Sequence, residues 1–126
     1  MNNIGYINTA HLNGEAWSHS ERMKQYGCSD IHVESPKGRR RPEWEKFVDS
    51  LENGDSAVLV SFDNAFRNFN DMVFFIKYCS KMGIRIISLH DELDTHDQLF
   101  PDRKTANTLD LICQVFAKRD RNSHDD

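Results

Sequence analysis

The chain has 126 residues, of which 38% are hydrophobic and 29% charged, a composition typical of a folded domain rather than of a disordered segment. Its formal net charge of −4 excludes a strongly basic protein that holds duplex DNA by charge alone, because that affinity comes largely from Lys and Arg. The sequence shows no signal peptide and no apolar run near the roughly 20 residues that cross a bilayer. We expect one cytoplasmic domain over residues 1–121 and a polar tail at 122–126.

The first part of the chain predicts a strand, a helix and a second strand. Residues 3–7 form a short apolar stretch that is typical of a strand. The segment 18–21 has capping-box spacing and predicts a helix start, and Gly27 predicts its end. Residues 30–34 form the second predicted strand.

A basic loop at 35–40 leads into a second predicted helix. Pro42 suits the first turn of a helix, where a missing N–H breaks no hydrogen bond. The apolar side chains that follow recur at helical spacing and predict one buried face: Trp44, Phe47, Val48 and Leu51. The turn residues 53–55 end this helix.

The rest of the chain continues the alternation of strands and helices. The continuously apolar residues 57–60 are typical of a central parallel strand covered on both faces. An amphipathic helix ends at Gly83, residues 84–89 predict another buried strand, and a last helix begins at Pro101 and runs towards Arg121. We therefore predict an α/β fold with an open, largely parallel sheet flanked by helices and a long C-terminal helix.

Three loops of this sheet are expected to face one cleft. In open parallel sheets, ligands bind beyond the carboxyl ends of the strands. The segments 8–11, 35–41 and 63–67 each follow a predicted strand. They are therefore the candidates for a binding or catalytic site.

Motifs in these segments resemble those of one known family. Residues 5–11, Gly-Tyr-Ile-Asn-Thr-Ala-His, resemble the G-Y-x-R-V-S-T opening of serine site-specific recombinases, the resolvases and invertases. Gly54 and Asp55, followed by Asp-Asn-Ala-Phe-Arg at 63–67, resemble the family's G-D…D-R-L-x-R segment at matching spacing. The Arg-Pro at 41–42 resembles the R-P that opens the family's second helix. The order and spacing of these motifs make the resemblance specific over almost the whole chain.

The resemblance implies a chemistry. In the family, a serine hydroxyl attacks a DNA phosphodiester and leaves a 5′-phosphoserine bond and a free 3′-hydroxyl. Arginines surround the phosphate, because preorganised cations stabilise the negative charge that develops on its oxygens. The matching cations retained in this chain are Arg41 and Arg67, with Asp63 available to orient Arg67 or another basic partner. Ordinary surface ion pairing is the alternative interpretation of these three residues.

Three other matching positions depart from the family pattern. Ala10 stands where the resemblance places the nucleophilic serine, and alanine has no nucleophilic atom. Asn8 and Asn64 stand where the family has arginines, and neither amide is charged. Loss of the nucleophile alone costs about 10⁶ in rate in serine hydrolases, so we expect a catalytically inactive domain. The expected remnant of the site consists of six residues: Asn8, Ala10, Arg41, Asp63, Asn64 and Arg67. The neighbours Thr9 and His11 are expected to project to the face opposite Ala10.

Two charged loops have both a functional and a structural interpretation. The segment 90–97 is rich in metal-ligand types, but a solvated acidic loop is the more common case, and we predict no metal and no cofactor. Arg39, Arg40 and Arg41 are candidates for contacts to DNA phosphates, although a solvated loop explains them equally well. Because the net charge is acidic, we expect DNA binding to be weak and salt-sensitive.

The last predicted helix has two apolar faces. One face would pack on the sheet and contains Leu109, Ile112, Cys113 and Phe116. Leu111 and Val115 lie on the other side, and a helix apolar on two faces usually buries both. In the family the matching helix forms the dimer interface, so Leu111 and Val115 are expected to belong to a self-association surface. We do not expect the separate DNA-binding module that family members usually carry further on.

The sequence leaves three hypotheses about function. The first is a catalytically inactive recombinase-like domain that self-associates, or pairs with an intact recombinase and modulates it. The second is a divergent active recombinase that uses another hydroxyl or a partner subunit. The third is a decayed remnant of a mobile element. A covalent protein–DNA adduct would distinguish the second hypothesis from the first.

Overall fold

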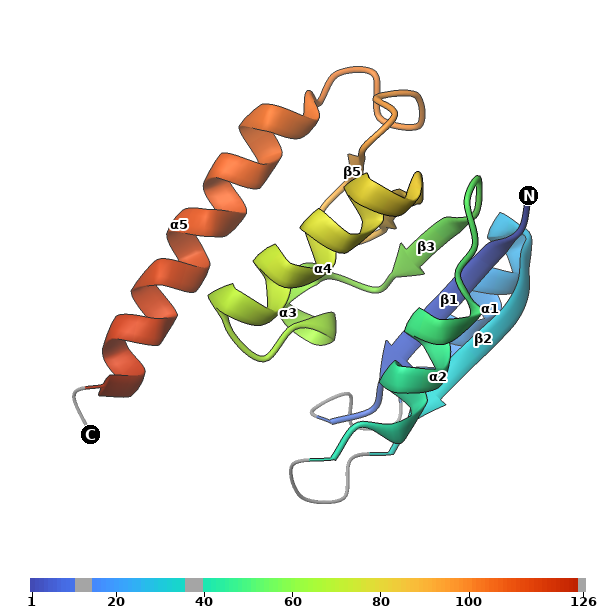
Figure 1. Ribbon diagram of the computed structural model, residues 1–126, viewed down its shortest axis with the longest axis horizontal. Coiled ribbons are helices and arrows are strands. Elements are labelled where there is room, and N and C mark those ends of the chain that lie inside the picture. Colours follow the sequence, from blue (N-terminus) through green and yellow to red (C-terminus); the bar gives the residue numbers. More distant parts are fainter. Residues whose placement is uncertain (11–14, 36–39, 125–126) are drawn as a thin grey trace.

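The computed structural model describes residues 1–10, 15–35 and 40–124, with side chains described up to residue 120 (Figure 1). Within these residues one sheet has the strand order β2-β1-β3-β4-β5. The strands are β1 (Asn3–Asn8), β2 (Cys28–Glu34), β3 (Ser56–Leu59), β4 (Arg85–Ser88) and β5 (Leu93–Asp94). The first four are parallel, and β5 pairs antiparallel with β4. The predicted α/β fold with a largely parallel sheet is confirmed.

Helices cover both faces of this sheet. They are α1 (Ala16–Tyr26), α2 (Pro42–Ser50), α3 (Phe62–Ala65), α4 (Phe69–Met82) and α5 (Thr105–His124). Helix α1 packs on one face through the buried Met23, and α2, α3, α4 and α5 pack on the other. Figure 1 shows α5 at the opposite end of the molecule from β2 and α1. The predicted long C-terminal helix is therefore present, at the β5 edge of the sheet.

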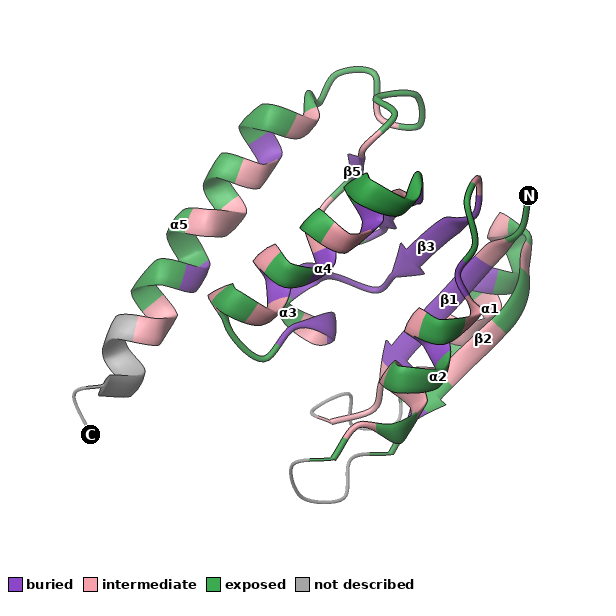
Figure 2. Cartoon of the chain, viewed as in Figure 1, coloured by how far each residue is buried: buried purple, intermediate pink, exposed green. Residues whose placement is uncertain are grey.

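The alternation of side chains along β1 and β3 builds a core on each face. Tyr6 and Leu59 point into the larger core with the aromatic residues of α2, α3 and α4, and Ile7 and Val58 point towards α1. Every residue of β3 is buried, which explains why Ala57, Val58 and Leu59 are all apolar. Figure 2 shows the buried residues concentrated in β1, β3 and the sheet-facing sides of the helices.

Helix α1 begins earlier and α5 begins later than predicted. Helix α1 starts at Ala16, without a side-chain cap, because the Ser18 hydroxyl donates to the Glu15 carbonyl (2.9 Å) from inside the first turn. Helix α5 starts at Thr105 rather than Pro101. The N–H of Thr105 donates to Oδ1 of Asp97 (2.9 Å), so a carboxylate from the preceding loop sets this helix start. The predicted ends at Gly27 and Gly83 are confirmed, since both glycines have left-handed backbones.

The two faces of α5 are as the sequence predicts. Phe116 is buried, and the other predicted core-facing residues, Leu109, Ile112 and Cys113, pack against the same core. Leu111 and Val115 are 60% and 62% exposed. Along the described part of the chain, no helix is long and apolar enough to span a membrane.

The acidic segment 90–97 is organised by one buried carboxylate. Asp94 is 2% exposed and accepts hydrogen bonds from Nε (2.7 Å) and a terminal nitrogen (2.5 Å) of Arg85. It also accepts three backbone N–H groups, those of His96, Gln98 and Leu99. Burial alone would raise the pKa of Asp94, but these donors lower it below its usual range. Among the described residues, no cluster of His, Cys, Asp and Glu is placed to hold a metal ion.

Candidate functional site

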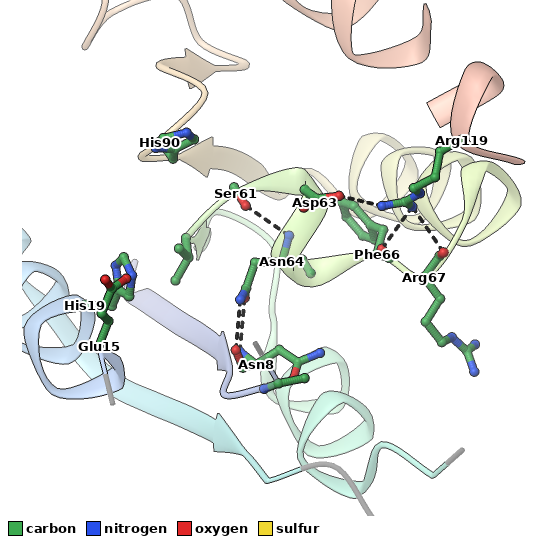
Figure 3. A pocket seen from close by; sticks show the side chains of 13 residues that line it. Asn8, Glu15, His19, Ser61, Asp63, Asn64, Phe66, Arg67, His90 and Arg119 are labelled. Atoms are coloured by element: carbon green, nitrogen blue, oxygen red, sulfur yellow. Dashed lines mark hydrogen bonds and ion pairs between the residues drawn. The ribbon is translucent and has the colours of Figure 1, made fainter. Parts of the chain in front are cut away.

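A cleft of about 510 Å³ opens beyond the carboxyl ends of β1, β3 and β4 (Figure 3). This is the edge at which open parallel sheets bind ligands. Five of the six residues of the expected remnant site line the cleft: Asn8, Ala10, Asp63, Asn64 and Arg67. The sixth, Arg41, is not among the lining residues. The structure therefore brings together residues from two segments that lie more than 50 positions apart in the sequence.

Asn64 joins α3 to the end of β1. Its side-chain Oδ1 accepts the backbone N–H of Asn8 (3.0 Å), and its Nδ2 donates to the Asn8 carbonyl (2.8 Å), as Figure 3 shows. The side-chain amide thus pairs with the backbone of Asn8 as a neighbouring strand would. The backbone N–H of Asn64 donates to the hydroxyl of Ser61 (2.9 Å), which caps α3. At a position where the family resemblance places an arginine, this chain has an asparagine whose side chain holds the backbone of Asn8.

The residues after β1 are fixed by short-range bonds. The side chain of Asn8 accepts the N–H of Ala10 (3.0 Å), which turns the chain as it leaves the strand. The hydroxyl of Thr9 donates to the Glu34 carbonyl (2.7 Å) of the neighbouring strand β2. Ala10 consequently lines the cleft while Thr9 is held against β2, in agreement with the predicted alternation. His11 lies outside the described residues.

Arg41 is placed differently from the prediction. Its side chain is 8% exposed, and one terminal nitrogen donates to Asp71 (2.9 Å). The other donates to the Ala65 carbonyl, and the guanidinium lies 4.4 Å from the ring centroid of Trp44. These contacts bury the Arg41 side chain between α2, α3 and α4. The side chain does not line the cleft. It also lacks the solvent exposure that a contact to DNA phosphates would need. Arg39 and Arg40 were predicted, with Arg41, to contact DNA phosphates. Arg40 is exposed, and Arg39 lies outside the described residues.

Glu34 supports this arrangement and was not predicted. It is 1% exposed, and its carboxylate accepts the backbone N–H groups of Glu43 (3.1 Å) and Trp44 (3.0 Å), which caps α2. The hydroxyl of Tyr6 also donates to it (3.2 Å). Burial raises the pKa of Tyr6 to about 12, so this hydroxyl stays protonated and continues to donate. The sequence signal is a carboxylate that ends a strand shortly before a helix-starting proline.

The partner of Asp63 is Arg119, from α5. One terminal nitrogen of Arg119 lies 2.5 Å from Oδ1 of Asp63, and the other donates to the carbonyl oxygens of Phe66 (3.5 Å) and Arg67 (3.1 Å) (Figure 3). The Arg67 side chain is 61% exposed, and its Nε lies 3.7 Å from Asp71. The sequence predicted Arg67 or another basic residue as the partner of Asp63, and Arg119 was not singled out because 56 positions separate it from Asp63.

The cleft offers little uncompensated positive charge to a phosphodiester. In the described lining, Arg119 is paired with Asp63. Arg67 has Asp71 nearby, which it shares with Arg41. Stabilising a phosphorane needs several preorganised cations. In the described lining, Arg67 and Arg119 each lie beside a carboxylate.

The comparison with known families agrees with the fold and the site. Residues 13–123 match the family described as "Resolvase, N terminal domain", which is most of the chain. The chain belongs to this resolvase family. The match begins after β1, so the place of Ala10 in this resolvase domain rests on the resemblance of residues 5–11.

Known proteins similar to this resolvase domain include transposon proteins and recombinases. It is 27% identical over 100 residues to the transposon Tn552 DNA-invertase BinR of Staphylococcus aureus, covering 77% of this chain and 48% of that protein. The chain spans about half the length of the curated relatives it matches. A resolvase family site-specific recombinase from Streptococcus pneumoniae has a similar fold, with a TM-score of 0.68, 10% identity, and coverage of 98% of this chain and 93% of that one. The N-terminal catalytic domain of TP901-1 integrase gives a TM-score of 0.61 at 14% identity, covering 99% and 98%.

Proposed function

We propose that this chain is a resolvase-family domain that does not cleave DNA by its own residues, and that acts by associating with a second copy or with an intact recombinase. The observation that carries the first part is Ala10. It lines the cleft at the end of β1, where the family resemblance places the nucleophilic serine, and it contributes a methyl group. The adjacent hydroxyl, on Thr9, donates a hydrogen bond to the Glu34 carbonyl on the neighbouring strand.

The arrangement of the other site residues supports the same proposal. Asn64 uses both ends of its side-chain amide to hold the backbone of Asn8. Arg41 is directed into the contact between α2 and α4. At positions where the family resemblance places phosphate-stabilising residues, the side chains of this chain thus hold the fold together.

The exposed side of α5 supports association. Leu111 and Val115 border a groove of about 320 Å³, whose floor includes Phe62, Ile112 and Phe116. Contiguous exposed apolar surface of this kind marks interfaces more often than isolated apolar residues do. In the resembled family the matching helix forms the dimer interface, which makes a second copy or a related recombinase the expected partner.

Replacing both Leu111 and Val115 with aspartate should convert the protein to a monomer, because two charges would be buried in the interface without partners. Sedimentation equilibrium measures the change, and circular dichroism checks that the fold is retained. Phe74→Asp is the matched control, since Phe74 is 76% exposed on α4 and its change should leave association intact. A wild-type protein that is monomeric at high micromolar concentration would contradict association with a second copy.

DNA binding by this chain should be weak, non-specific and steeply dependent on salt. The net charge is −4, and Arg40 and Arg67 are exposed cations of the described surface. Fluorescence anisotropy with a labelled duplex at several salt concentrations measures the binding. Arg40→Gln should reduce the slope of log K against log salt by about 0.9, the value for one phosphate contact. Nanomolar affinity for one sequence at physiological salt would contradict this expectation.

A further inference from the structure

The turn between α2 and β3 contains an Asn-Gly pair, Asn53 and Gly54. Asparagine is a chemically labile residue. It is most labile before glycine, because glycine has no side chain to hinder attack by its own backbone nitrogen on the preceding side-chain amide. Asn53 is exposed to water, and Gly54 has a left-handed backbone with a φ of 90°. The pair is therefore able to deamidate wherever the chain around it is free to move.

Hydrogen bonds to the end of α4 occupy both reacting groups of this pair. Nδ2 of Asn53 donates to the Met82 carbonyl (3.0 Å), and the backbone N–H of Gly54 donates to the Gly83 carbonyl (2.9 Å). Carbonyl groups at the end of a helix have no partner within the helix, and the turn supplies one to each. Figure 1 shows the loop before β3 and the end of α4 on the same side of the molecule. The attacking nitrogen and the leaving amine are thus held by two consecutive residues.

The absence of a side chain at Gly83 lets Asn53 come this close. Gly83 has a left-handed backbone with a φ of 71°, and a Cβ built on it would collide with Nδ2 of Asn53. Gly27, which ends α1 in the same left-handed conformation, has no such neighbour among the described residues. A Cβ built there would lie 3.7 Å from Nδ2 of Asn3, an ordinary contact. The two glycines therefore have similar backbones but differ in whether they position Asn53.

We propose that Asn53 is a deamidation site that the end of α4 keeps closed. The reaction begins when the Gly54 N–H leaves the Gly83 carbonyl and gives its proton to solvent. The Gly54 nitrogen then forms a bond to Cγ of Asn53, the bond from Cγ to Nδ2 breaks, and the amine takes up a proton and leaves as ammonia. Water opens the resulting succinimide ring to an aspartate or to an isoaspartate. Water is the only co-reactant that the sequence of steps needs.

The product cannot restore the closed arrangement. A carboxylate has no N–H to donate to the Met82 carbonyl, and its negative charge would lie at the C-terminal end of α4, where the helix dipole disfavours it. An isoaspartate also adds a backbone carbon inside the turn 52–55. That turn is closed by the Asp55 N–H bonding to the Glu52 carbonyl (2.9 Å) and by the Glu52 N–H bonding to the Asp55 carboxylate (2.8 Å). Deamidation would therefore weaken the junction of α2, β3 and α4 irreversibly.

The test follows deamidation of the full chain at mildly alkaline pH. Mass spectrometry of proteolytic peptides measures the reaction at Asn53 and separates it from Asn13, whose own Asn-Gly pair lies outside the described residues. The chain unfolded in guanidinium chloride gives the rate without protection. Gly83→Ala should push the Asn53 side chain away from α4. Gly27→Ala is the matched control, because it places alanine in a left-handed backbone at the end of another helix without touching Asn53.

Two hydrogen bonds of ordinary net strength correspond to a protection of about thirtyfold. The folded wild type should therefore deamidate at Asn53 about thirtyfold more slowly than the unfolded chain. Gly83→Ala should lose most of this protection, and Gly27→Ala should keep it. Equal rates in the folded and unfolded wild type would overturn the proposal. So would equal acceleration by the two glycine variants, since that result would assign the reaction to global unfolding.

Hydrogen exchange decides the question if Gly83→Ala does not fold. The Gly54 N–H must leave the Gly83 carbonyl both to exchange with solvent and to attack Asn53, so one local opening controls both processes. In the wild type, low concentrations of guanidinium chloride should raise the exchange rate of this amide and the deamidation rate in the same proportion. A deamidation rate that changes independently of this exchange rate would contradict the closed site.

Discussion

Asp94→Asn should lower the free energy of unfolding at neutral pH by about 3 kcal/mol, the size expected when one partner of a buried ion pair is removed. The Asp94 side chain is fully buried, and the variant would leave the Arg85 guanidinium without its counter-charge. An asparagine has one acceptor oxygen in place of two, so it also cannot satisfy all the donors that Asp94 now accepts. Urea unfolding of both proteins measures the difference.

The effect of Asp94→Asn should depend on pH in a defined direction. The pKa of Asp94 is lower in the folded protein than in the unfolded chain. Its contribution to stability is therefore fully present above the unfolded value of about 4 and is lost as the pH falls through the lower folded value. The gap between wild type and variant should narrow as the pH is reduced below about 4. Glu92→Gln is the control, because the Glu92 and Arg103 side chains are each about half exposed and such pairs contribute about 1 kcal/mol or less. A gap that stays constant down to acid pH would contradict the role given to Asp94.

Restoring the nucleophile alone should not restore DNA cleavage. Ala10→Ser would place a hydroxyl in the cleft, but the loss of a phosphate-stabilising arginine costs about 10³–10⁵ in rate in phosphoryl transfer. The triple variant Asn8→Arg, Ala10→Ser, Asn64→Arg should show weak covalent attachment to DNA, detected after denaturing lysis. Ala10→Ser by itself, assayed beside the triple variant, is the control for the nucleophile.

The substitutions that restore the two arginines should also lower the stability of the folded protein. Asn64→Arg removes the acceptor for the Asn8 N–H and the paired geometry at the end of β1. Asn8→Arg removes the acceptor for the Ala10 N–H. Each lost hydrogen bond costs about 1 kcal/mol, so the triple variant should be folded but less stable than wild type, as thermal unfolding would show. Strong cleavage by Ala10→Ser alone would contradict the account of the missing cations.

The fold was predictable because its signals are local. Each signal can be recognised without reference to the rest of the chain. The apolar run at 57–60 predicts a strand, the glycines at 27 and 83 predict helix ends, and the apolar pattern of α5 predicts its buried face. Helix α3 and strand β5, of four and two residues, carry no such periodic signal. They exist because Ser61 caps one and the pairing with β4 forms the other.

Most members of the site were predictable, but its geometry was not. The rule that ligand sites lie beyond the carboxyl ends of parallel strands brought Asn8, Ala10 and the segment 63–67 together, and the structure places them in one cleft. The direction of Arg41 and the partner of Asp63 depend on Asp71 and Arg119, which are distant in sequence. Side-chain pairing between residues so far apart in the sequence gives no pattern in local residue spacing, so the sequence alone does not predict it.

The most direct test of the central claim is to look for a covalent protein–DNA adduct of the unmodified chain. The chain is expressed in cells, the cells are lysed under denaturing conditions, and protein attached to DNA is recovered and analysed by mass spectrometry. A serine recombinase with an intact nucleophile, treated in parallel, shows that adducts survive the procedure. A chain whose cleft presents Ala10 in place of serine should yield no adduct. An adduct of the unmodified chain, mapped to Thr9, to Ser61 or to any other hydroxyl, would contradict the account.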